Sequence, residues 1–362
     1  SGWTGDLVIS NNTTYGPDQT SIARLGHSLA LTAKNDVTMN YNSILQAGGN
    51  SVTIGSLQTK GGTGAFLGNV GTVSANVNAS TEIIENAALT PGTLRIAQAT
   101  PSNVEVKWDA HFRDGTPAST VTAPGSSIGG ASLSIVKAGE GWASLTLQNQ
   151  YTGTTVVEQG ILQVGVNGIG DTGAVRNANI AGLTLNAGAT LAGSGTVQGA
   201  AVLNGLIKPG DVGGAAMGTL SITGNVVFGA GSETFFQLSR PSFTMPELLN
   251  ATAAVVADPV YQSQRDNLLL YDTTKYVNEL NTPVLSSQHD SLTIGGTVQV
   301  TPGAKFTVLL NGYSPTAGDV FRLLNLDSNN TLDATGAPGL LAISTGNALQ
   351  SVSSGVEDLI LP

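Results

Sequence analysis

The group of residues best equipped for acid–base chemistry lies between Val104 and Arg113. Glu105, Asp109 and His111 bring two carboxylates and an imidazole together there, a combination that general acid–base catalysis uses. Apolar and charged residues alternate along this stretch, and a period of two predicts one half-buried strand with its charges on the solvent face. Alternating charges on a solvent face require no catalytic role. We therefore assign no catalytic function to this cluster.

Other residue patterns that would indicate chemistry are missing from the sequence. The histidines lie far apart, there is no cysteine, and no Gly-x-Ser-x-Gly sequence marks a nucleophile. The glycine-rich run 61–64 lacks the Lys-Ser or Lys-Thr pair of a phosphate-binding loop. The Gly-Gly-x-Gly-x-Asp calcium repeat is also absent. We predict no catalytic, cofactor-binding or metal-binding residue, and no cofactor.

The composition restricts the partners that this chain can have. Only 10% of the 362 residues are charged, against about 25% in an ordinary soluble domain, and the net charge is −10. No run of Lys or Arg appears, and nucleic-acid binding needs a basic surface, so we exclude a nucleic-acid partner. No apolar run approaches the roughly 18 residues of a membrane span, so we expect none in this chain, and we expect any anchoring device to lie outside it.

Short apolar runs separated by Gly and Asn turns recur along most of the chain, and residues 136–165 are their clearest example. Leu145 and Leu147, and then Thr155 and Val157, follow the period of two that is typical of strands. Runs of three to five residues are too short to stay paired as isolated hairpins. Each run must therefore lie against a similar neighbour, which predicts a solenoid.

The same residues resemble the autotransporter-associated β-strand repeat, also called the passenger-associated transport repeat. Its pattern is close to K-x-G-x-G-x-L-x-L-x-x-x-N-x-Y-T-G-x-T-x-V-x-x-G-x-L-x-V. The matching segments are Lys137–Gly139, Leu145–Leu147, Tyr151–Val156 and Glu158–Gly165, whereas Trp142 stands where the family usually has a small residue. The resemblance covers under a tenth of the chain. It implies a right-handed parallel β-helix of a secreted or surface-exposed bacterial protein, and it implies no catalytic residue.

We divide the chain into three parts. Residues 1–240 are predicted to form β-helix turns, with the repeat motif at 136–165. Glycine disappears and helix-forming residues gather after Pro241, so residues 241–286 are predicted to be a helical insertion with helices near 245–257 and 259–280. Residues 287–362 return to short strands. The predicted fold class is an all-β, right-handed parallel β-helix with a short helical insertion.

These features favour a structural or adhesive protein of the bacterial surface or extracellular matrix that is not an enzyme. We expect a stiff rod that can self-associate into filaments by end-to-end stacking of strands. One alternative is a β-helical polysaccharide lyase or hydrolase, which would need a groove of clustered acidic residues. Another is a module that binds a cell-surface polysaccharide, or a host or matrix ligand, through the insertion. The expected location is extracellular or the bacterial cell surface.

Overall fold

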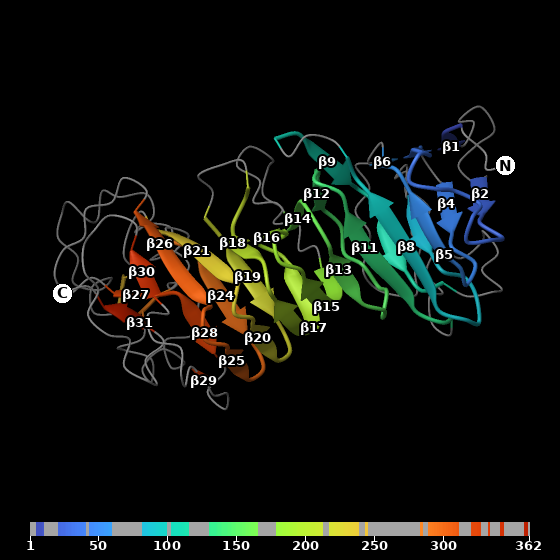
Figure 1. Ribbon diagram of the computed structural model, residues 1–362. Helices are drawn as coiled ribbons and strands as arrows, with labels where there is room; N and C mark the ends of the chain where they lie inside the picture. Colours follow the sequence, from blue (N-terminus) through green and yellow to red (C-terminus); the bar gives the residue numbers. More distant parts are fainter. Residues whose placement is uncertain are drawn as a thin grey trace, which may run out of the picture.

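The computed structural model describes residues 5–10, 21–40, 43–59, 82–99, 103–115, 130–165, 179–212, 217–238, 243–244, 283–284, 289–310, 320–326, 332–333, 341–343 and 358–360. Within these ranges the chain is all-β and contains no helix, and its strands follow one another along one axis from the N-terminal to the C-terminal end (Figure 1). The parallel pairing of most strands confirms the prediction of an all-β, parallel architecture.

The largest sheet has twelve strands, which pair in parallel. Its main path contains β5 (Ser51–Ile54), β8 (Gly92–Ala97), β11 (Leu133–Ala138), β13 (Thr155–Val157), β15 (Asn179–Leu185), β17 (Thr196–Leu203), β19 (Thr219–Ile222), β24 (Ser291–Ile294) and β28 (Leu324–Leu326). A second row at its C-terminal end contains β20 (Val226–Phe228), β25 (Val298–Val300) and β29 (Leu332–Asp333). We call it the twelve-stranded sheet.

Three smaller parallel sheets complete the stack. The eight-stranded sheet contains β9 (Glu105–Trp108), β12 (Trp142–Leu145), β14 (Ile161–Val164), β16 (Thr190–Gly193), β18 (Leu206–Pro209), β21 (Glu233–Leu238), β26 (Lys305–Leu310) and β30 (Leu341–Ile343). The four-stranded sheet contains β2 (Ser21–Arg24), β4 (Ser43–Gln46), β7 (Ile83–Glu85) and β10 (His111–Arg113). The three-stranded sheet contains β1 (Leu7–Ile9), β3 (Val37–Met39) and β6 (Leu57–Thr59).

The chain visits these sheets in a regular order. From β11 to β19 it alternates between the twelve-stranded and the eight-stranded sheet. After that, two strands of the twelve-stranded sheet precede each strand of the eight-stranded sheet, as in β19, β20 and β21, and again from β24 to β26. Before β11 it also passes through the four-stranded sheet, which therefore adds a third face to the N-terminal half. The three-stranded sheet meets the eight-stranded sheet at Thr59, whose hydroxyl donates to the Lys107 carbonyl (3.0 Å) and accepts from the Asp109 amide (2.8 Å).

The core consists of columns of side chains, because paired residues of parallel strands lie directly above one another. One column of the twelve-stranded sheet has eight members that are all at most 3% exposed: Ile54, Ile96, Lys137, Val157, Leu185, Leu203, Phe228 and Val300. Each aliphatic or aromatic member contributes about 1.5–3 kcal/mol by its burial. Burial in this column therefore depends on the pairing of neighbouring parallel strands.

The charged stretch at 104–113 departs from its prediction. It forms two strands in different sheets, β9 and β10, because the chain bends at Asp109 and Ala110. Trp108 and Phe112 are buried as expected, but His111 (6% exposed) and Arg113 (5%) are buried as well. The prediction of one strand with all its charges in solvent is therefore wrong, since the bend turns the second half of the stretch into a new face.

The predicted helical insertion lies largely outside the described residues, including both of its expected helices, 245–257 and 259–280. Its described ends pair with each other, β22 (Phe243–Thr244) running antiparallel to β23 (Pro283–Val284). The stack itself continues from β21 to β24, where the sequence predicted that strands resume. A second antiparallel pair, β27 (Val320–Arg322) with β31 (Asp358–Ile360), lies near the C-terminal end.

Two glycines allow a matched test of how closely neighbouring turns approach each other. Gly193 (φ 109°) and Gly188 (φ 82°) both have backbone angles that L-residues avoid. A Cβ at Gly193 would overlap the Val164 carbonyl oxygen of the preceding turn, whereas a Cβ at Gly188 would meet open space.

We therefore predict that Gly188→Ala lowers the free energy of unfolding by about 1–2 kcal/mol, the cost of its backbone angle alone. Gly193→Ala should lower it by about 3 kcal/mol or more, because the backbone of a neighbouring turn must move. Urea denaturation followed by circular dichroism measures both values. Equal losses for the two variants would contradict the close approach of the turns.

Candidate functional site

Polar residues line up across the four-stranded sheet and form a ladder. Arg24, Gln46, Glu85 and Arg113 are register partners on β2, β4, β7 and β10, and Gln150 follows them through an isolated parallel bridge to Arg113. The first three follow a short apolar pair, such as Ile44-Leu45 before Gln46, whereas Arg113 follows His-Phe and Gln150 follows Gln-Asn. We call these five residues the polar ladder.

Hydrogen bonds connect the first four members of the polar ladder. The Arg24 Nε donates to Gln46 Oε1 (2.8 Å), and the Gln46 Nε2 donates to Glu85 Oε1 (2.7 Å). The Arg113 Nε donates to Glu85 Oε2 at 2.7 Å and completes an ion pair whose side chains are 6% and 0% exposed. The buried carboxylate therefore has a partner on each of its oxygens, as buried charges require.

The four-stranded sheet ends close to Gln150, the last residue of the polar ladder. Within the described ranges, β10 is its final strand, and only the Arg113–Gln150 bridge continues it. A cavity of about 410 Å³ lies at this end. Its lining residues, which define what we call the amide cavity, are Gln148, Asn149, Gln150, Tyr151, Thr152, Thr196 and Gln198.

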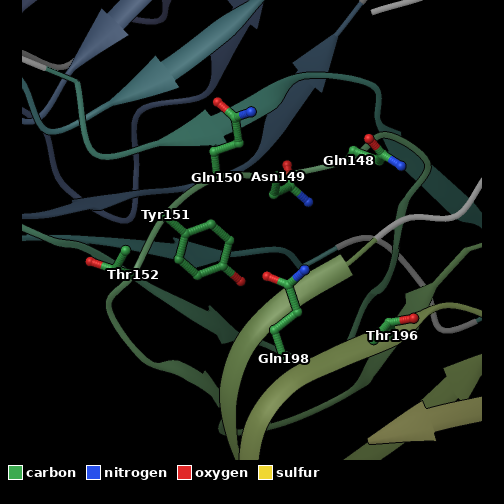
Figure 2. Close-up of a pocket in the computed structure, with 7 residues that line it drawn as sticks. All are labelled: Gln148, Asn149, Gln150, Tyr151, Thr152, Thr196 and Gln198. Atoms are coloured by element: carbon green, nitrogen blue, oxygen red, sulfur yellow. The ribbon is translucent and has the colours of Figure 1, made fainter. Parts of the chain in front are cut away.

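Two segments that are distant in sequence form the walls of the amide cavity. Figure 2 shows residues 148–152 on one side and β17, which carries Thr196 and Gln198, on the other. Gln148, Gln150 and Gln198 are exposed, whereas Asn149 and Tyr151 are each 5% exposed. None of the seven lining residues carries a charge. The cavity can therefore offer amide and hydroxyl groups to a ligand, but no ionic partner.

Two residues of the segment 136–165 stabilise the stack from inside. Lys137 occupies the otherwise apolar column described above, and its ammonium donates to the carbonyls of Gly139 (2.8 Å), Gln159 (3.0 Å) and Ala138 (3.3 Å). Burial lowers the pKa of Lys137 to about 8. Because the ammonium joins its own turn to the next, it has a structural role.

Thr155 also connects neighbouring turns, in the column that contains its register partners Ile135 and Leu183. It is fully buried, its hydroxyl donates to the Ala181 carbonyl (2.9 Å), and it shares a 2.6 Å hydrogen bond with the Tyr151 hydroxyl. Burial raises the pKa of Tyr151 well above its usual range. The phenol is thus a neutral hydrogen-bonding group at any ordinary pH.

Two more buried groups titrate abnormally where the predicted insertion returns to the stack. The Asp290 carboxylate accepts hydrogen bonds from the amides of Gly218 and Gln237 (both 2.9 Å), and burial raises its pKa to about 7. Burial lowers the pKa of the adjacent His289. Asp290 thereby connects the start of β19, the end of β21 and the start of β24.

The residues that sequence analysis considered for catalysis do not assemble into one site. His111 lies on β10 with Nδ1 2.8 Å from the Gln148 carbonyl oxygen, and burial lowers its pKa, so its imidazole is neutral at pH 7. Asp109 accepts a hydrogen bond from the Thr146 hydroxyl, and Glu105 lies on the neighbouring sheet. In the described part of the chain, no three His, Cys, Asp or Glu side chains gather as they would around a metal ion.

Sequence analysis missed the polar ladder and the amide cavity. The spacing between ladder residues follows the lengths of the connecting segments, so it has no fixed period. For the first three ladder residues, the available signal was the repeated position of a polar residue directly after a short apolar pair, as in Ile83-Ile84-Glu85. The partners of such residues across the sheet became visible only in the structure.

No family model matches the chain, and no curated protein matches it. Among the residues that the structure describes, no helix is both long enough and apolar enough to cross a membrane.

The buried ion pair of the ladder can be tested against a half-exposed one. Arg113→Met leaves Glu85 buried without its cation, which should lower the free energy of unfolding by about 3–5 kcal/mol. Arg95 pairs with Glu158 at the surface, where the side chains are 38% and 34% exposed, so Arg95→Met should cost less than about 1 kcal/mol. Chemical denaturation of both variants measures the difference, and similar losses would refute the structural role of the ladder.

The buried lysine predicts a specific pH dependence of stability. Native Lys137 loses its proton near pH 8, whereas the unfolded chain keeps it until about pH 10.5, so the unfolded state binds more protons in between. The free energy of unfolding should therefore rise between pH 8 and pH 10, by about 2 kcal/mol. At higher pH, ionisation of Tyr151 in the unfolded chain opposes this rise.

Lys137→Met is the matching variant because it keeps the length of the side chain and removes its charge. It should flatten this part of the stability profile, as measured by denaturation at several pH values. An unchanged slope in Lys137→Met would show that another group causes it.

Proposed function

We propose that the chain forms a right-handed β-helix and acts as a non-catalytic structural module outside the bacterial cell, where copies associate end to end. The regular order in which the chain visits its sheets supports the helical path. The right hand and the extracellular setting rest on the resemblance of residues 136–165 to the autotransporter-associated repeat. The stacking of successive strands supports a rod.

The edge that β1 and β2 form among the described strands is the observation that carries the association. Leu7 and Ala23 head two core columns and are only partly buried, whereas their partners in the next turn, Val37 (0%) and Leu45 (1%), are buried. Among the described residues, β1 and β2 pair on one side only, and they also expose Val8 (60%) and Ile22 (39%). Such edges favour pairing with another chain.

A second copy of the chain fits this end better than an unrelated partner. At the other pole the twelve-stranded and eight-stranded sheets end in β28, β29 and β30, which also have one unpaired side among the described strands. The last strands of one copy can thus pair in parallel with the first strands of another copy. The distance between them would be the strand spacing of about 4.8 Å that neighbouring turns already have. Because the two poles differ, the contact is head to tail and leads to filaments.

The buried ionisable groups support a structural role over a catalytic one. Glu85, Arg113, Asp114 and Lys137 each form hydrogen bonds that connect neighbouring turns. Asp114 illustrates this, since its carboxylate accepts from the Leu133 amide and from the amide and hydroxyl of Thr152. A polysaccharide-processing enzyme would instead present carboxylates in an accessible groove.

End-to-end association predicts that the chain forms larger particles as its concentration rises. Val8→Lys with Ile22→Lys should keep it monomeric, because lysines on edge strands oppose further pairing. Light scattering after size-exclusion chromatography and negative-stain electron microscopy measure the outcome.

Val202→Lys is the matched control for this experiment. Val202 is also exposed (41%), but its strand is paired on both sides, to β15 and to β20. This variant should assemble like the unmodified chain. A chain that stays monomeric at every concentration, or equal loss of assembly in the control, would refute association through the N-terminal end.

A further inference from the structure

We infer that the amide cavity binds an uncharged sugar unit of a glycan. This binding site is separate from the ends of the stack and does not depend on end-to-end association. The inference rests on the charge, hydrogen-bonding capacity, rigidity and size of the cavity.

The cavity has no available charged group, which argues against an ionic ligand. Arg113 lies behind the cavity, but it is buried and paired with Glu85. His111 is kept neutral by burial, which lowers its pKa, and the Asp114 carboxylate is occupied by Thr152 and Leu133. A phosphate, a uronic acid or a metal ion would therefore lose its hydration without gaining an ionic partner.

The hydrogen-bonding groups suit a ligand that carries several hydroxyls. An amide side chain offers both donors and an acceptor, and a threonine hydroxyl offers both roles on one atom. The side chains of Gln148 and Gln198 extend from opposite walls, and neither forms a hydrogen bond with the described residues. Sugar hydroxyls are mixed donors and acceptors as well, so they can bond to both walls.

Three of the remaining lining residues, Asn149, Tyr151 and Thr152, form a rigid base for these two glutamines. Asn149 accepts from the Phe112 amide (2.9 Å) and donates to the Leu147 carbonyl (3.1 Å). Thr152 is fixed by Asp114, and Tyr151 by Thr155. A preformed wall reduces the entropy that is lost on binding, which favours a small ligand.

The size of the cavity supports the same class of ligand. A volume of about 410 Å³ falls within the range of small-molecule sites, about 300–1,000 Å³. Because the cavity opens at the side of the stack, a longer glycan can continue into solvent beyond the bound unit. The proposed ligand is thus one or two neutral sugar residues of a chain.

Isothermal titration calorimetry and saturation-transfer NMR with the full chain can test this inference. The neutral probes are maltotriose, cellotriose, lactose and N,N′-diacetylchitobiose, and the charged probes are sialyllactose and trigalacturonate. At least one neutral probe should bind with a Kd of about 1 mM or tighter, and the charged probes should bind more weakly.

Substitution of both exposed glutamines locates the binding. Gln148→Ala with Gln198→Ala should weaken binding of the neutral probe about tenfold or more, because both walls lose their hydrogen-bonding groups. Gln299→Ala removes a comparable exposed glutamine on β25 and should leave the affinity unchanged.

Three results would overturn the inference: no binding of any neutral probe, tighter binding of a charged probe, or unchanged affinity in the double variant. The same titrations on the Val8→Lys, Ile22→Lys variant separate sugar binding from association. Binding by that variant together with loss of its assembly would show that the two properties are independent.

Discussion

The structure depends on the register of parallel strands, which places each side chain directly above its counterpart in the neighbouring turn. Strands of two to eight residues cannot bury their apolar side alone, so every turn relies on the turns before and after it. A column tolerates a polar residue only where backbone or side-chain hydrogen bonds satisfy it. Lys137 and Thr155 meet this condition with carbonyls of their own and adjacent turns. Gln46, Glu85 and Arg113 meet it by bonding to one another.

The same constraint explains where a ligand can approach the molecule. The amide cavity lies where the third face of the N-terminal half stops at Gln150. The residues around it are held from behind by groups that belong to the stack, such as Phe112 and Asp114. Stability and recognition thus use different atoms of the same segment. Asn149 and Thr152 fix the wall, while Gln148 and Gln198 face outward.

Sequence reasoning identified the class of architecture because period-two patterning and glycine turns are local properties. It placed Leu145, Thr155 and Val157 in strands and predicted the return to strands near 289–294, where β24 begins. It misread 104–113, because a bend at Asp109 moves Arg113 to another sheet without interrupting the alternation. It also missed the polar ladder and the amide cavity, since Arg24, Glu85 and Gln150 meet through pairings that depend on connection lengths. The predicted helices of the insertion lie outside the described residues.

A spin-label distance would test the stacked register most directly. Val156, Thr184, Val202, Val227 and Gln299 are successive register partners along the outer side of the twelve-stranded sheet. Four steps of about 4.8 Å place the backbones of Val156 and Gln299 about 19 Å apart, although the predicted insertion separates them in sequence. Double electron–electron resonance on the chain labelled at Val156→Cys and Gln299→Cys should give one narrow distribution near this value, lengthened only by the labels. A broad distribution, or one centred beyond about twice this distance, would contradict the stack.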